Sequence, residues 1–220
     1  MFRRLSISIL SAAVAFAPAQ LSAQSADALI ARAQTAWSRV TTLRATFEQT
    51  LTNPLTGSAL VSRGELQQRK PDRLSITFNE PSGDRIVADG RYVWLYLPSA
   101  TPGQVFRMSA NDAMAANTDL IGQFLVTPRA KYDIVDSGRE TLGERASRVL
   151  VLTAKPGESL PFLRAKVWID SADALIRQFE ATDASGVTRR VRLLTLQPNA
   201  AVESSKFAFT VPSGVRVIDR

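Results

Sequence analysis

Two residue types are missing from this chain, which has no cysteine and no histidine among its 220 residues. Without cysteine the protein cannot form a disulfide, so its hydrophobic core has to stabilise it unaided. A lipid anchor on an exported protein also needs a cysteine at the cleavage site, and we therefore expect a free chain. Without histidine a serine–histidine catalytic pair is excluded, and zinc, copper and haem lose their commonest ligands. We expect neither a metal nor another cofactor.

Motifs of common enzymes are missing too. Neither G-x-S-x-G nor S-x-x-K occurs, which removes familiar nucleophile motifs of hydrolases, and no glycine-rich loop offers a phosphate cradle. A hydrolase with paired carboxylates is still open on composition, with Glu48, Glu65 and Glu180 as candidates. These acids alternate with other residues along strands, which is typical of a solvated sheet face. We expect a protein that is not an enzyme.

The N-terminus has the three-part layout of a secretory signal. The basic pair Arg3-Arg4 precedes an apolar run, Leu5–Ala17, and small residues follow up to Ala23. The run is too short to span a bilayer. We expect residues 1–23 to be a signal peptide cleaved near Ala23. Residues 24–220 would then form a single domain exported to the periplasm.

The formal net charge is +7 at pH 7, which favours acidic partners or anionic surfaces. Nucleic acid is a poor match, because the chain has an export signal and no recognised binding motif. The densest basic cluster, Arg189–Arg192, lies within a strand-like segment. We expect it to be part of a solvated outer face.

The periodicity predicts a mainly β protein with some helix. Apolar residues recur at helical spacing from Asp27 to Val40, and about ten or eleven short strands follow in meander order. The period-two pattern is lost in Ser109–Val126, which suggests one or two short helices ended by Pro128, and a further short helix is expected near Ala201–Lys206. A sheet of that many antiparallel strands tends to curl or close. The helices would then plug its concave side.

The segment Arg85–Pro98 reads as a β-hairpin that is apolar on both faces. Asp89-Gly90 is predicted to supply the two positive-φ residues of a type I′ turn. In the second strand, Val93, Leu95 and Leu97 share one face and Tyr92, Trp94 and Tyr96 share the other. We expect one face to meet the concave side and the other to lie under chain that wraps around the outside. The pattern leaves open which face is which.

A curved sheet covered by helices can form an apolar pocket. The candidate lining residues alternate along the first three strands and include one phenylalanine of the helical insertion: Leu43, Phe47, Leu66, Leu74, Ile76, Phe78 and Phe124. From the pattern alone, a filled core is the stronger interpretation.

Four segments resemble the bacterial periplasmic lipoprotein carrier family, LolA. They are "LRATFEQT" (Leu43–Thr50), Gly64 and Leu66 followed by "RKPDRLSITF", the block "EPSGDRIVADGRYVWLYLP", and the C-terminal "FAFTVPSGVRVID". Each motif is weak singly, but the four occur in the family's order and together span almost the whole exported part of the chain.

The resemblance implies an incomplete, half-open antiparallel β-barrel of about eleven strands, with a helical lid over a hydrophobic cavity. Family members receive triacylated lipoproteins from an ABC exporter in the inner membrane. They carry this cargo across the periplasm to an acceptor lipoprotein on the outer membrane. The acceptor carries a lipid-modified cysteine. Because this chain has no cysteine, it resembles the soluble carrier, which would act as a monomer.

The resemblance also implies roles for particular residues. The acyl-chain cavity would be lined by Leu43, Phe47, Leu66, Leu74, Ile76, Phe78, Trp94 and Tyr96, and the lid would contain Met114, Leu120, Ile121 and Phe124. Family members often have a lid-closing arginine immediately before the proline of the third strand. Here that position is Lys70, which lacks the planar guanidinium fork. We expect Lys70 to close the lid less firmly, or closure to be arranged otherwise.

The sequence thus supports a periplasmic carrier that binds the acyl chains of lipoproteins. The alternative is another job for the same half-barrel, such as a sensor of mislocalised lipoproteins or a carrier of a different lipid. A sensor usually brings a second domain or a membrane anchor, and neither is apparent. An enzyme acting on lipids or glycans is a third hypothesis.

Overall fold

The computed structural model describes residues 18–110, 119–158 and 160–220. They form one sheet of twelve strands in the order β12-β6-β5-β4-β3-β2-β1-β11-β10-β9-β8-β7. The strands are β1 (Thr42–Thr52), β2 (Ala59–Arg69), β3 (Arg73–Glu80), β4 (Ser82–Asp89), β5 (Tyr92–Tyr96), β6 (Gln104–Ser109), β7 (Tyr132–Leu142), β8 (Arg145–Ala154), β9 (Arg164–Asp170), β10 (Ile176–Thr182), β11 (Thr188–Pro198) and β12 (Arg216–Asp219).

The sheet is curved and open, because β7 and β12 form its two edges. Every pairing is antiparallel except that of β12 with β6, which is parallel. Strands joined by short turns pair antiparallel, so the meander follows from the turn lengths. The expected open antiparallel barrel is confirmed, and β12 is the strand beyond the expected eleven or so.

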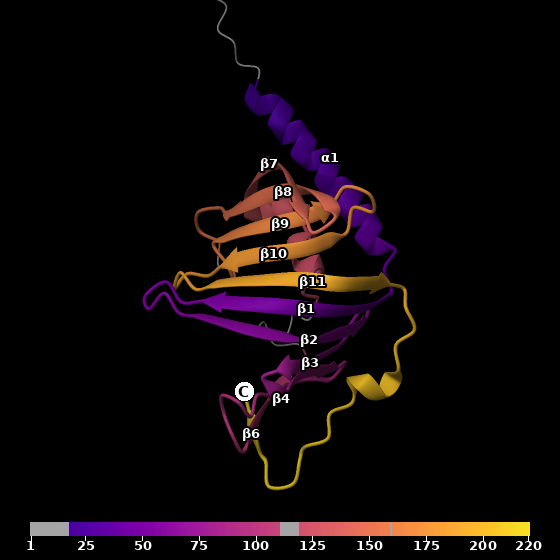
Figure 1. The fold of residues 1–220 in the computed structure, drawn as a ribbon, viewed down its shortest axis with the longest axis vertical. Coiled ribbons are helices and arrows are strands. Elements are labelled where there is room, and N and C mark those ends of the chain that lie inside the picture. Colours follow the sequence, from indigo (N-terminus) through magenta and orange to yellow (C-terminus); the bar gives the residue numbers. More distant parts are fainter. Residues whose placement is uncertain (1–17, 111–118, 159) are drawn as a thin grey trace, which may run out of the picture.

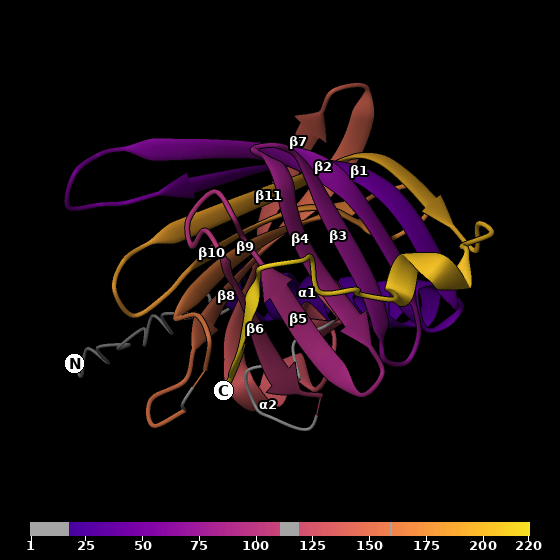
Figure 2. The same cartoon turned by 90° about the horizontal axis from the view of Figure 1, so that it is seen from below.

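Helices occupy the concave side of the sheet. They are α1 (Pro18–Ser38), α2 (Pro128–Lys131) and the 3₁₀ turn η1 (Gly122–Phe124), and a second 3₁₀ turn, η2 (Ser204–Phe207), lies in the C-terminal segment. Figure 1 shows the order of the strands, and Figure 2 shows the sheet arching over α1 and α2. The buried face of α1 carries Ala26, Leu29, Ile30, Ala33 and Trp37, and Val40 is buried just after the helix ends. Its helical spacing is the one that the sequence indicated.

A second apolar cluster lies on the outer face of the sheet. Trp94 and the buried valines Val87 and Val105 pack there with Tyr92, Tyr96, Phe209, Val211, Val215 and Val217. Trp94 stacks on Phe209 with ring centroids 5.4 Å apart. The C-terminal segment therefore covers the aromatic face of β5, while Val93 and Leu95 pack in the concave cluster. Both apolar faces of this strand are thus accounted for.

The turn between β4 and β5 differs from the expected type I′ turn. Gly90 has a φ of +88°, whereas Asp89 is not among the residues of positive φ. The Asp89 carboxylate instead accepts hydrogen bonds from the backbone N–H groups of Arg91 and Tyr92 and from the Trp94 indole. This arrangement closes the turn with one glycine, since aspartate readily bonds the backbone two residues on.

Three boundaries also differ from the expectations. Strand β7 continues through Asp136–Gly138, whose residue types are typical of a turn, because a bulge between Asp136 and Arg139 absorbs the irregularity. Pro128 begins α2 instead of ending a helix, as suits proline in a first helical turn. Helix α1 begins at Pro18 and so includes the expected cleavage position at Ala23.

Candidate functional site

Six predicted lining residues lie together on the concave face. Leu43, Phe47, Leu66, Leu74 and Ile76 are each at most 6% exposed, and the half-buried Phe78 packs against them. The Phe47 and Phe78 rings meet edge to face at 5.6 Å. A Cβ at Gly64 would overlap the Thr77 carbonyl oxygen and lie 3.1 Å from the Phe47 ring. Glycine is therefore required at this position for Phe47 to lie over β2.

The expectation that Trp94 and Tyr96 line this concave face is wrong. Both belong to the outer cluster, where Tyr96 lies 5.8 Å from Phe209 between ring centroids. The reason is the period of two along β5: Val93 and Leu95 point to the concave side, so their neighbours point outward. The hydrophobic pattern could not decide between the two faces, because both are apolar.

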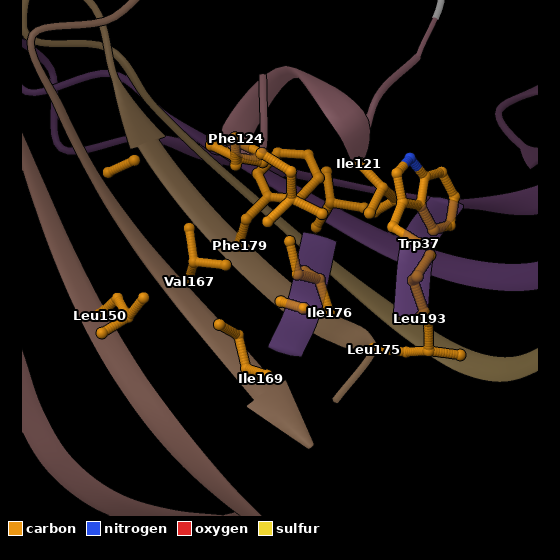
Figure 3. Packing of buried hydrophobic residues seen from close by; sticks show 14 of the residues in the cluster. Trp37, Ile121, Phe124, Leu150, Val167, Ile169, Leu175, Ile176, Phe179 and Leu193 are labelled. Carbon is orange, nitrogen blue, oxygen red and sulfur yellow. The ribbon is translucent and has the colours of Figure 1, made fainter. Parts of the chain in front are cut away.

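The lid segment, defined here as residues 119–126, packs its apolar side chains into the concave cluster. Ile121 is 2% exposed and Phe124 is 3% exposed, and Leu120 is half-buried against the same cluster. Phe124 lies 4.9 Å from Phe179 and 5.3 Å from Phe162 between ring centroids, and Figure 3 shows it above Phe179. The fourth predicted lid residue, Met114, lies outside the described residues.

Polar bonds tie the lid segment to α1. The Trp37 indole nitrogen donates to Asp119 Oδ2 at 3.0 Å, and the Gly122 N–H donates to Asp119 Oδ1 at 2.9 Å. One turn earlier on α1, Gln34 Nε2 donates to the Leu125 carbonyl at 2.7 Å. The lid segment is therefore bonded to α1 at both of its ends.

Lys70 lies beside Trp37, where α1 meets the lid segment. Its ammonium group donates to the Trp37 carbonyl oxygen at 2.6 Å and sits 4.0 Å from the centre of the Trp37 ring. Burial lowers the pKa of Lys70, and the charge of Asp119 partly opposes that effect. Lys70 thus contacts the residue that bonds the lid segment. Whether it controls closure stays a prediction.

The concave side is filled by protein. Side chains of α1, of the lid segment and of both halves of the sheet pack into one cluster, in which Val167, Ile176 and Leu193 are each at most 7% exposed. Figure 3 shows Trp37 and Ile121 side by side over this surface. A long apolar ligand could enter only if the lid segment or α1 moved.

Two of the three candidate carboxylates form ion pairs, and the third is exposed. Glu48 and Glu180 pair on the outer face with Arg63 at 2.8 Å and with Arg190 at 2.5 Å, and Glu65 is exposed. Arg190 and Arg192 face outward and Val191 packs inward. The expected solvated outer face is confirmed for the exposed Arg190, whereas Arg192 is half-buried. Among the described residues no group of three or more acidic, histidine or cysteine side chains is arranged to hold a metal ion.

Several residues of the site were not predicted from sequence. The Asp119 bond to Trp37 joins residues 82 positions apart. Phe179 lies on β10 and Phe162 lies just before β9, in the other half of the protein. The hydrophobicity of the two phenylalanines indicates that they are buried but does not indicate which residues they contact. None of the helices in the described ranges is both long and apolar enough to cross a membrane.

The chain is thus an open antiparallel barrel whose apolar concave face lies under α1 and a bonded lid segment. This chain belongs to the family of the outer membrane lipoprotein carrier protein LolA, whose model matches residues 38–210. It is 28% identical over 188 residues to the outer-membrane lipoprotein carrier protein of Proteus mirabilis (strain HI4320), covering 83% of this chain and 84% of that protein. The carrier protein of Salmonella typhi is 29% identical over 185 residues, with 83% of each chain covered.

Solved structures of low identity share the fold. An uncharacterised conserved protein from Thermus thermophilus superposes with a TM-score of 0.56 at 16% identity, covering 90% of this chain and all of that one. A structure of MucB superposes with a TM-score of 0.54 at 16% identity, covering 89% of this chain and 66% of that one. At these identities the likeness concerns the fold alone.

Proposed function

We propose that this protein is a periplasmic chaperone that binds the acyl chains of lipoproteins and carries them from the inner membrane to an acceptor on the outer membrane. Its family membership supports a carrier of lipoproteins, and the observation that carries the finer proposal is the covered concave face. Leu74 and Ile76 belong to a continuous apolar surface, buried under the lid segment. A ligand that replaced the lid segment would meet a mainly apolar surface there.

The energetics suit such a role. Each methylene group buried is worth about 0.8 kcal/mol, so leaving several acyl chains in water would cost tens of kcal/mol. The empty carrier faces the same problem, because a large exposed apolar patch invites aggregation. Packing Ile121 and Phe124 into the concave face solves it for the empty state. Bound acyl chains would compete for the same surface, which keeps the net affinity low enough for delivery.

The proposed partners are a triacylated lipoprotein, the ABC exporter that releases it and an outer-membrane acceptor lipoprotein. The role is non-catalytic and needs no cofactor. The proposal also includes an export signal that is cleaved near Ala23 and a single domain over residues 24–220. N-terminal sequencing of the protein purified from the periplasm would locate the cleavage site.

A release assay tests the proposal. Inner-membrane vesicles holding the exporter and a labelled lipoprotein receive ATP, with or without the purified protein. We expect soluble lipoprotein only when the protein is present, in a complex of the two. If a known carrier releases the cargo and this protein does not, the assigned cargo is wrong. Binding of other lipids, by a carrier or a sensor, is then the hypothesis to test.

A further inference from the structure

Strand β11 is longer than its neighbour β10, and part of its edge is unpaired. On one side β1 pairs with β11 along its length, up to Leu43 opposite Pro198. On the other side β10 pairs with β11 only as far as Gln178 opposite Arg192. Within residues 18–110, 119–158 and 160–220, no strand pairs with β11 beyond Arg192 on this side. Every second backbone N–H and C=O group of residues 193–197 therefore lacks a partner strand.

A groove of about 870 Å³ lies along this edge. One wall is the β7–β8 hairpin tip at residues 142–146, another is the β9–β10 turn at residues 170–172, and the third is β11 at residues 192–196. A Cβ at Gly143 would lie 3.4 Å from Arg192 Nη2, so the hairpin tip closely approaches the strand. The free edge of β11 is therefore enclosed by the hairpin tip and by the β9–β10 turn, unlike the outermost edges of the sheet.

The groove carries a surplus of cationic side chains. Its lining includes Arg145, Arg177 and Arg192, against the acids Glu144 and Asp170. Asp170 is nearly fully buried and is shared by Arg145, at 2.8 Å, and Arg177, at 3.2 Å. The Arg145 side chain is 56% exposed, so its guanidinium still faces the groove and solvent. An acidic occupant would be favoured over a basic one.

The groove also offers apolar contact. Leu194, at the bulge of β11 where the register with β1 shifts, is 53% exposed. Leu142 of the hairpin tip is half-buried in the opposite wall. A free phosphate would use the arginines but neither these leucines nor the alternating backbone groups. An extended polypeptide would contact the arginines, the leucines and the unpaired backbone groups.

We infer that this groove binds an extended acidic segment of a partner protein, which adds as a strand to the free edge of β11. Backbone hydrogen bonds to residues 193–197 would supply affinity, as in other cases of strand addition. Arg145 and Arg192 would select acidic side chains, and Leu194 would contact apolar residues between them. The groove shares Leu193 and Leu196 with the concave cluster, but none of its lining residues belongs to the lid segment.

Peptide titrations followed by NMR test the inference. The isotope-labelled protein is titrated with a synthetic hexapeptide of alternating glutamate and valine. We expect shifts and slowed amide exchange concentrated in residues 193–197. Arg192→Glu should weaken binding by roughly tenfold, because it reverses a charge in the groove. Arg189→Glu makes the same charge change on the same strand outside the groove lining, and it should have little effect.

Two control peptides separate the parts of the inference. A peptide with lysine in place of glutamate should bind at least tenfold more weakly, and equal binding would overturn the preference for acid. The glutamate peptide with every backbone nitrogen methylated should not bind, and equal binding would overturn strand addition. Absence of binding, or shifts that map to β7 or β12 instead, would overturn the site. No lipid is present in the titration, so its outcome is distinguishable from that of the release assay.

Discussion

The Trp37 indole nitrogen lies 3.0 Å from Asp119 Oδ2, and this hydrogen bond joins α1 to the lid segment. The two residues are 82 positions apart in the sequence, yet α1 and the lid segment together cover the concave face. Trp37 is 6% exposed, so its N–H group would be left buried without a partner if Asp119 moved away. An unsatisfied buried donor costs about 1–3 kcal/mol. The bond therefore contributes to keeping the lid closed in the empty protein.

Asp119→Ala should make the lid segment open more readily. The change removes the acceptor for Trp37 Nε1 and for the Gly122 N–H. We expect exchange of the Leu125 and Val126 amide protons, both bonded to the Gly122 carbonyl, to become roughly tenfold faster, since a loss of about 1.4 kcal/mol corresponds to that factor. Hydrogen exchange followed by NMR measures it.

Glu140→Ala is the matched control for this change. Glu140 accepts the indole hydrogen of Trp168 at 2.7 Å, but this pair lies on the outer face of the sheet. The control should leave exchange in the lid segment unchanged. Equal acceleration in both variants would mean that the Asp119 effect is a general loss of stability.

Gly122→Ala should weaken the same junction through crowding. A Cβ at this position would overlap Asp119 Oδ2 and lie 2.9 Å from Trp37 Nε1, so the carboxylate would have to move. We expect faster exchange in the lid segment and tighter binding of a fluorescent fatty-acid probe. Combined with Asp119→Ala, the effects should not add, because both changes act on one bond. Fully additive effects would contradict the proposed mechanism.

The sequence predicted what depends on local alternation and helical spacing. The buried positions Leu43, Ala45 and Phe47 of β1, and Leu29 and Trp37 of α1, follow from periods of two and 3.6 residues. These patterns, with short turns between strands, are sufficient to indicate an open antiparallel sheet around a helix.

What could not be predicted depends on contacts between distant segments. Trp94 is as apolar as its neighbours Val93 and Leu95, and only the C-terminal segment with Phe209 determines that it faces outward. Strand β12 pairs in parallel with β6, more than a hundred residues earlier, and has no local signature. The bond between Asp119 and Trp37 could not be predicted from the sequence either, because a polar residue in a loop is usually solvated.

Lys70→Met should change how stability depends on pH. Burial lowers the pKa of Lys70 below its ordinary value of 10.5, so the folded state loses this proton more readily than the unfolded state. The unfolded state therefore binds more protons in this range, and the wild-type protein gains stability as pH rises from the folded pKa towards 10.5. Lys70→Met should lack that gain in urea unfolding at pH 7 and pH 10.

The exposed lysine Lys206 supplies the control for this comparison. Lys206→Met should retain the pH dependence of the wild-type protein. The Lys70 variant also loses the bond to the Trp37 carbonyl, so the closure hypothesis expects faster fatty-acid probe uptake. Unchanged uptake and release of lipid would contradict a role for Lys70 in closing the lid.

Asp89→Asn should reduce stability and its dependence on acid. Burial alone would raise the pKa of Asp89, but hydrogen bonds from the Trp94 indole and the Tyr92 and Arg91 amides, with the charge of Arg73, lower it. A lowered carboxyl pKa stabilises the fold above the unfolded value, and this contribution is lost as pH falls through the folded pKa. We expect a loss of about 1 kcal/mol at pH 7 and a flatter profile below pH 4.

Asp72→Asn tests whether that effect is specific. Asp72 forms an exposed, loose pair with Arg73 at 3.8 Å, and such surface pairs contribute little. Chemical unfolding between pH 3 and pH 7 should therefore give nearly the wild-type profile for this variant. A profile as flat as that of Asp89→Asn would mean that the acid dependence reflects overall charge in this region.

The two apolar clusters should respond differently to truncation of an aromatic residue. Trp94→Leu removes a ring stacked on Phe209 in the outer cluster, and Phe124→Leu removes a ring packed on Phe179 in the concave cluster. Each should lower the free energy of unfolding by about 2 kcal/mol, since each leaves a partial cavity. Only Phe124→Leu should alter fatty-acid probe binding, because only that ring belongs to the covered surface. A change in probe affinity for Trp94→Leu, measured where both variants are fully folded, would place part of the lipid site on the outer face.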